Sequence, residues 1–233
     1  MARGHDDPEA ILCAGPASFN DRAARTGGAA AAPQADAPPA DVPPALRVTR
    51  PVVLVGLMGA GKTCVGRLLA RRLGLGFVDS DEEVVKASAC SIADIFRLYG
   101  EAAFREGERK VMRRLLGAGP VVLASGGGAF MDPETRDMIR EGATSVWLRA
   151  SLDTLVARTA GRPGRPLLEG RDPRAVLESL IAERYPVYAR ADVVVDTAND
   201  AKDAVAERIV RALAAAADAG RGTGRGAEHE LVL

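Results

Sequence analysis

A glycine-rich turn constrains this chain more than any other feature of its sequence. Residues 56–63 read Gly-Leu-Met-Gly-Ala-Gly-Lys-Thr and match the pattern G-x-x-x-x-G-K-[ST], directly after an apolar run and directly before a helical pattern. Glycines let a backbone wrap around a phosphate with its N–H groups pointing inward, and the N-terminus of the next helix adds partial positive charge. Lys62 can then reach the β- and γ-phosphates, and Thr63 can bind Mg²⁺. A turn that merely caps a buried helix is the alternative, but the strand, lysine and hydroxyl together favour nucleotide binding.

Short apolar runs alternate with longer helical patterns in the central part of the chain. The runs are 52–55, 76–78, 121–124, 145–148 and 193–195, and the helical patterns cover about 62–73, 91–99, 101–116, 133–141, 151–160, 172–188 and 202–217. The runs are rich in β-branched residues and apolar on both faces, which is typical of strands buried in a parallel sheet. This alternation predicts an α/β fold with helices on both faces of the sheet, in which ligands bind at the carboxyl ends of the strands.

Composition divides the chain into three parts. Residues 1–47 are rich in Ala and Pro and have few large apolar side chains, so we expect a disordered extension. Residues 48–217 have the size of a single folded domain, and residues 218–233 are expected to form a flexible tail. The arginine-, proline- and glycine-rich stretch at about 161–172 interrupts two helices and predicts a mobile lid. An exposed loop with arginines for solubility is the alternative.

The charge balance narrows the range of partners. Lys and Arg together number 31, as do Asp and Glu, which argues against nucleic acid or an anionic membrane as the main partner. The cysteines Cys13, Cys64 and Cys90 form no close pair, so we expect reduced thiols. No apolar run is long enough to cross a bilayer, and the early acidic residues lead us to expect no secretion signal at the N-terminus. We therefore expect a cytoplasmic monomer that acts on small molecules.

Two carboxylates follow the second apolar run, at Asp79 and Asp81. Residues two apart on an extended segment point the same way, so both side chains can face one site. One suits Mg²⁺ coordination through water, and the other can align or deprotonate an acceptor hydroxyl. The alternative is that Asp79 or Ser80 caps a helix that begins near Asp81, and capping is compatible with catalysis. The guanine-reading pattern Asn-Lys-x-Asp of GTPases is not found, which favours adenine.

Other polar positions are ambiguous from their residue types alone. Residues 125–129 read Ser-Gly-Gly-Gly-Ala after the third apolar run, where glycines can simply form a loop or let a substrate approach the backbone. The end-of-strand position favours the second interpretation. Arg105 and Arg184 lie in helical patterns beside glutamates and would ordinarily be surface residues.

The motifs together resemble the shikimate kinase family. The resemblance rests on Gly-Leu-Met-Gly-Ala-Gly-Lys-Thr, Asp-x-Asp, Ser91-Ile-Ala-Asp-Ile-Phe96, Phe-Arg-x-x-Glu, Gly-Gly-Gly, Arg-Pro-Leu-Leu and Glu-Arg-x-Pro-x-Tyr, in family order over nearly all of residues 50–197. It implies MgATP-dependent phosphorylation of the 3-hydroxyl of shikimate, which gives 3-phosphoshikimate and ADP on the route to chorismate and the aromatic amino acids. It also implies a three-layer P-loop kinase fold with a five-stranded parallel sheet and a closing lid, as in nucleoside monophosphate kinases.

The resemblance also assigns roles to individual residues. It implies that Asp81 contacts the shikimate hydroxyls as the catalytic carboxylate, together with Lys62 and the lid arginine Arg165. It implies that Thr63 binds Mg²⁺ directly and that Asp79 supports the metal through a water molecule. The shikimate carboxylate would be held by Arg105, Arg184 and the backbone of Gly127. The implied ATP contacts are Gly59, Ala60, Gly61, Lys62, Thr63, Cys64, Arg158 and Arg165, with Cys64 standing where the family often has a second hydroxyl.

Two other functions remain in view at this point. A gluconate kinase of the same architecture would keep the phosphate loop but should lack the arginines of Phe-Arg-x-x-Glu and Glu-Arg-x-Pro-x-Tyr. A catalytically dead nucleotide-binding regulator need not retain Lys62, Thr63, Asp79, Asp81 and Arg165 together.

Overall fold

Five parallel strands form one sheet in the computed structural model, which describes residues 48–160, 168, 170–198 and 200–223. The sheet order is β2-β3-β1-β4-β5. The strands are β1 (Val52–Val55), β2 (Gly76–Asp79), β3 (Val121–Ala124), β4 (Thr144–Arg149) and β5 (Val193–Asp196). Each predicted apolar run is a strand, and the predicted parallel α/β sheet is confirmed. The carboxyl ends of β1, β2 and β3 lie together at one edge of the sheet, which is where the motifs occur.

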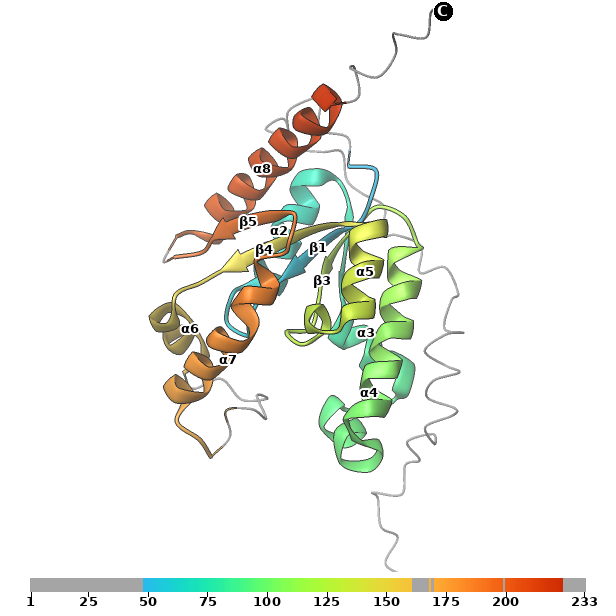
Figure 1. The fold of residues 1–233 in the computed structure, drawn as a ribbon, viewed down its shortest axis with the longest axis vertical. Helices are drawn as coiled ribbons and strands as arrows, with labels where there is room; N and C mark the ends of the chain where they lie inside the picture. Colours follow the sequence, from blue (N-terminus) through green and yellow to red (C-terminus); the bar gives the residue numbers. More distant parts are fainter. Residues whose placement is uncertain (1–47, 161–167, 169, 199, 224–233) are drawn as a thin grey trace, which may run out of the picture.

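The helices form a layer on each face of the sheet (Figure 1). They are α2 (Lys62–Leu73), α3 (Ser80–Ser88), α4 (Ile92–Leu116), α5 (Pro133–Gly142), α6 (Leu152–Thr159), α7 (Pro173–Tyr188) and α8 (Lys202–Thr223), with a short 3-10 helix η1 (Ala129–Met131) after β3. Helices α2 and α8 pack against each other, whereas α5 contacts β4 and α4. This arrangement is the predicted three-layer fold.

The helix boundaries differ from the predicted patterns at two places. Helix α3 was not among the predicted helical patterns, although a helix starting near Asp81 was the alternative interpretation of the two carboxylates. The predicted break between 91–99 and 101–116 is confirmed, because α4 is interrupted at Gly100, whose φ of 78° and ψ of 174° are not helical. Helix α8 continues to Thr223, beyond the predicted end at residue 217.

Burial follows the position of each strand in the sheet. β1 is central and all four of its residues are buried. β5 is an edge strand: Val193 and Val195 are buried, whereas Val194 is 42% exposed on the other face. The expectation that all five strands are covered on both faces is therefore wrong for β5. Trp147 of β4 lies opposite Val194 in the register, and its ring packs edge-on against Tyr185 of α7 at 4.9 Å.

Several predicted segments lie outside the described residues: 1–47, the lid residues 161–167 and 169, and 224–233. Cys13 and Arg165 are among them. Cys64 is a free, exposed thiol, as expected. Within the part of the chain that the structure describes, no helix is both long and apolar enough to span a membrane.

Candidate active site

The glycine-rich turn forms a tight loop between β1 and α2. Gly56 has a φ of 144°, and a Cβ atom there would lie 2.8 Å from the carbonyl oxygen of Leu148, so this position requires glycine on both counts. The Lys62 Nζ donates hydrogen bonds to the carbonyl oxygens of Gly56 (2.7 Å) and Leu57 (3.2 Å). The ammonium group of Lys62 thus lies over the loop. A phosphate bound there would replace the two carbonyl oxygens as the hydrogen-bond partner of Lys62.

Thr63, in the first turn of α2, contacts Asp79, the last residue of β2. The Thr63 hydroxyl donates to Asp79 Oδ2 at 3.0 Å, and Asp79 Oδ1 accepts a hydrogen bond from the Asp81 N–H at 3.1 Å. Asp79 therefore caps α3 and also contacts Thr63 of the phosphate loop, so the capping role is confirmed and leaves one carboxylate oxygen facing the loop. Hydroxyl and carboxylate oxygens are hard donors that suit Mg²⁺. No group of three or more His, Cys, Asp or Glu side chains among the described residues is arranged to hold a metal by itself.

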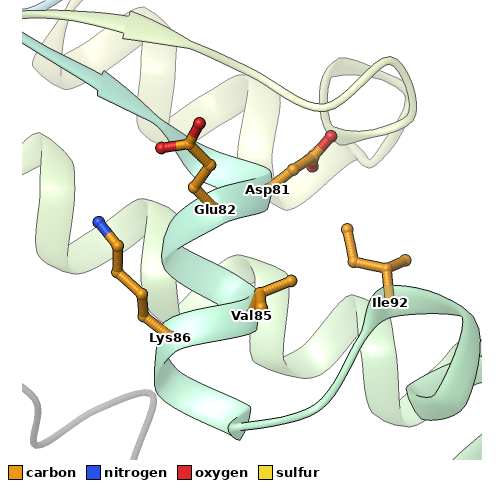
Figure 2. A pocket seen from close by; sticks show the side chains of 5 residues that line it. All are labelled: Asp81, Glu82, Val85, Lys86 and Ile92. Carbon is orange, nitrogen blue, oxygen red and sulfur yellow. The ribbon is translucent and has the colours of Figure 1, made fainter. Parts of the chain in front are cut away.

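Asp81 projects from the first turn of α3 toward the end of β3. Burial, followed by the nearby charge of Asp79, raises the pKa of the Asp81 carboxyl, while Lys62 and Arg105 oppose this shift. The residue also lines a cavity of about 420 Å³ together with Glu82, Val85, Lys86 and Ile92. Figure 2 shows Asp81 on the side of α3 that faces Ile92, whereas Glu82 and Lys86 project from the other side. A partly buried carboxylate with a raised pKa is suited to accepting a proton.

Arg105 of α4 lies beside a buried carboxylate that the sequence reasoning left without a role. The Arg105 Nη1 donates to Glu108 at 2.8 Å, and the Glu108 side chain is only 3% exposed. Burial raises the pKa of Glu108, and the bond to Arg105 opposes that shift. Arg105 also contacts the exposed Glu101 at 3.2 Å. The spacing Phe-Arg-x-x-Glu contained the signal, because residues three apart share one face of a helix.

Arg184 of α7 reaches the same region from the opposite side. Its Nη1 donates to the carbonyl oxygen of Gly127 at 3.1 Å, and its side chain is 14% exposed. The hydroxyl of Tyr188, a fully buried residue, donates to the same carbonyl. Burial raises the pKa of Tyr188 to about 12, so the hydroxyl stays protonated as a donor. Tyr188 belongs to Glu-Arg-x-Pro-x-Tyr but had no predicted role.

Three other residues were predicted to contact ATP: Arg158, Cys64 and Arg165. The Arg158 Nη1 lies 3.5 Å from the carbonyl oxygens of Gly59 and Ala60, and its Nη2 donates to the carbonyl of Ala198 beyond β5. Arg158 therefore borders the phosphate loop. Cys64 follows Thr63 in α2 with an exposed side chain. Arg165 lies outside the described residues.

Taken together, a phosphate loop after β1, carboxylates after β2 and two arginines beside the glycines after β3 define a P-loop small-molecule kinase. The family model described as shikimate kinase matches residues 58–214. A shikimate kinase of Paramagnetospirillum magneticum is 58% identical over 167 residues, which cover 72% of this chain and 86% of that protein. The chain belongs to the shikimate kinase family.

Two further comparisons agree with this assignment. A shikimate kinase of Mesorhizobium japonicum is 50% identical over 165 residues, covering 71% of this chain and 81% of that protein. The structure of shikimate kinase from Acinetobacter baumannii in complex with shikimate superposes with a TM-score of 0.69 at 35% identity, covering 71% of this chain and 93% of that chain. The predicted fold, family and ATP-dependent kinase activity are therefore confirmed.

Proposed function

We propose that this chain transfers the γ-phosphoryl group of ATP to the 3-hydroxyl of shikimate, with Asp81, Lys62 and Arg165 as its catalytic residues. Its kinase activity follows from the family; the residue roles are the proposal. The observation that carries it is the meeting of three functional groups at one loop: Asp81, Arg105 and Arg184 all lie against Gly126, Gly127 or Gly128. Two guanidinium groups and one carboxylate beside one loop suit an acceptor that is both a carboxylate and an alcohol.

The two arginines would bind the acid end of the acceptor. A guanidinium group is a planar donor that matches a carboxylate with two parallel hydrogen bonds. Arg105 and Arg184 come from α4 and α7 and flank the loop from opposite sides. The N–H of Gly127 would add a backbone contact, since its carbonyl is already bonded to Arg184 and Tyr188. An uncharged sugar acceptor would offer neither arginine an anionic group beyond the glutamates that each already contacts.

Asp81 would then receive the proton of the acceptor hydroxyl. The hydroxyl oxygen forms a bond to the γ-phosphorus, the bond from that phosphorus to the β–γ bridging oxygen breaks, and the hydroxyl proton passes to the Asp81 carboxylate. Because phosphoryl transfer has a loose transition state, positioning and charge neutralisation provide most of the rate enhancement. Lys62 and Arg165 are proposed to stabilise the charge on the phosphate oxygens.

Mg²⁺ is the proposed metal, and Thr63 and Asp79 are its proposed partners. The Thr63 hydroxyl would bind the ion directly and Asp79 through water, and their 3.0 Å separation supports a shared role. When bound, the ion neutralises charge on the β- and γ-phosphates. Arg158 is proposed to contact the adenine, and Gly59, Ala60, Gly61 and Cys64 the phosphates.

The cellular setting and the domain limits remain proposals as well. We propose a cytoplasmic monomer without nucleic acid or membrane partners, with a catalytic domain at 48–217, a lid at about 161–172, an extension at 1–47 and a tail at 218–233, of which residues 218–223 continue α8. The balanced charge supports the proposal that nucleic acid and membranes are not partners. The limits of the family match, 58–214, support the limits of the catalytic domain.

A coupled ADP-release assay with MgATP tests the proposal. Shikimate, gluconate and no acceptor are compared for the unmodified chain and for Asp81→Asn. We expect ADP release only with shikimate, and a loss of roughly 100- to 10,000-fold in turnover for Asp81→Asn, the range for removal of a general base. ADP release that gluconate stimulates equally would contradict the acceptor assignment, and an active Asp81→Asn variant would contradict the role of that carboxylate.

A further inference from the structure

The three consecutive glycines after β3 do not have the left-handed φ that usually calls for glycine. The described glycines with φ in the left-handed region are Gly56, Gly59, Gly61, Gly74, Gly100, Gly119 and Gly170. Gly126, Gly127 and Gly128 are not among them, and Gly128 has a helical φ of −96° and ψ of −19°. None of the three therefore needs a left-handed φ, and alanine could adopt the Gly128 conformation without backbone strain. The reason for glycine must therefore lie in what surrounds the loop.

Functional side chains occupy the space that a side chain would need at two of these positions. A Cβ atom on Gly126 would lie 2.6 Å from Asp81 Oδ1 and 3.1 Å from Glu108 Oε1. A Cβ atom on Gly128 would lie 2.7 Å from both terminal nitrogens of Arg105. Gly127 differs, because a Cβ atom there would meet Arg184 Nη1 only at an ordinary 3.6 Å.

We propose that Gly126 and Gly128 are positioning residues, whose bare Cα atoms set where the Asp81 carboxylate and the Arg105 guanidinium rest. This inference depends on the proposed function, in which Asp81 receives the proton and Arg105 binds the acceptor carboxylate. The proton acceptor and the carboxylate-binding group then both rest against one loop. Gly126 is itself fixed, since its N–H donates to the buried Ser80 hydroxyl at 3.0 Å.

Adding a methyl group should move the side-chain tips rather than the loop. An ordinary contact of a Cβ atom begins at 3.4 Å. The Asp81 oxygen, at 2.6 Å from the added Cβ, and the Arg105 nitrogens, at 2.7 Å, would therefore have to move away to at least that distance. Both groups sit at the ends of side chains and can rotate away, whereas a clash with backbone would disturb the fold. We therefore expect a change in function with little change in stability. A displacement of about 1 Å at a reacting group can cost roughly 100-fold in rate.

The test compares Gly126→Ala and Gly128→Ala with Gly142→Ala in the ADP-release assay. Gly142 ends α5, and a methyl group added there would meet nothing within 4 Å, so its variant is a matched control with unchanged kinetics. Gly126→Ala should lower kcat roughly 100-fold with KM for ATP unchanged. Gly128→Ala should raise KM for shikimate roughly tenfold with kcat nearly unchanged, which corresponds to the weakening of one charged hydrogen bond.

A double-mutant cycle separates positioning from a purely structural effect. Arg105→Lys removes the planar group that meets Gly128, so Gly128→Ala should cost much less in that background than alone. Equal costs in both backgrounds, or a parallel loss of thermal stability and of all kinetic constants, would overturn the inference. Glycine variants that behave like Gly142→Ala in an otherwise active, shikimate-dependent enzyme would overturn it too, while leaving the proposed function intact. An unmodified chain without shikimate-dependent ADP release would overturn both.

Discussion

Glu108→Gln removes the charge of a buried carboxylate but keeps its shape, and we expect the free energy of unfolding to change by less than about 1 kcal/mol at neutral pH. Loss of one partner from a buried ion pair usually costs about 3–5 kcal/mol. Here burial outweighs the attraction of Arg105 and raises the pKa of Glu108, so the charged form is less stable in the folded chain than in the unfolded one. Glutamine still offers an acceptor to Arg105, and exchanging a charged for a neutral hydrogen bond loses about 1 kcal/mol. Relief of the buried charge offsets that loss.

The pH dependence of stability provides the sharper measurement. Because the folded-state pKa of Glu108 is raised, its contribution to stability is fully present below the unfolded-state value, near 4.5, and is lost as the pH rises through the folded-state pKa. Urea unfolding across this range should therefore show that the stability of wild type relative to Glu108→Gln falls as the pH rises. Glu101→Gln is the matched control: it removes the other carboxylate of Arg105, which is 67% exposed, and should change stability by less than about 1 kcal/mol.

Two outcomes would refute this reasoning. A loss of about 3 kcal/mol or more for Glu108→Gln at neutral pH would show that the attraction of Arg105 exceeds the cost of burial. A stability of wild type relative to the variant that grows as the pH rises would show that the fold stabilises the charged form of Glu108.

Two other substitutions test hydrogen bonds at the site. Thr63→Val removes the hydroxyl that donates to Asp79 at 3.0 Å, and we expect activity to fall roughly 10- to 100-fold with a weaker response to Mg²⁺, restored by Thr63→Ser; an unchanged Mg²⁺ titration in the ADP-release assay would contradict the metal role. Tyr188→Phe removes one of two donors to the Gly127 carbonyl and should cost about 1 kcal/mol in urea unfolding, because Arg184 still satisfies that oxygen. Since the pKa of Tyr188 is about 12, this loss should be constant through the neutral range; a pH-dependent loss there would count against it.

Local patterns predicted the strands well and one helix poorly. The run 52–55 coincides with β1, because an apolar, β-branched stretch directly before a phosphate loop is compatible with few structures other than a buried strand. Helix α3 was harder to recognise, since its first turn carries Asp81, Glu82 and Glu83 and its sequence lacks a sustained apolar stripe. Its signal was the cap at Asp79 and the acidic first turn, which favour a helix N-terminus. The exposure of Val194 was not predictable from its strand, because sheet order decides which strand lies at an edge.

Some residues of the site could be predicted from their neighbours in the sequence, whereas the positions of others depend on tertiary contacts. The phosphate loop and the carboxylate pair could be recognised from adjacent residues, whereas Arg105 and Arg184 resembled surface residues until the family pattern assigned them. Their positions depend on contacts with the loop after β3, which no local pattern encodes. Two glycines of that loop show the limit most clearly: the sequence suggested a simple loop or substrate access, yet Gly126 and Gly128 have no left-handed φ and it is their neighbours that leave no room for a side chain. A run of glycines with ordinary φ angles is therefore better interpreted by asking which distant side chains need the space, and here those side chains are the proposed proton acceptor and the carboxylate-binding arginine.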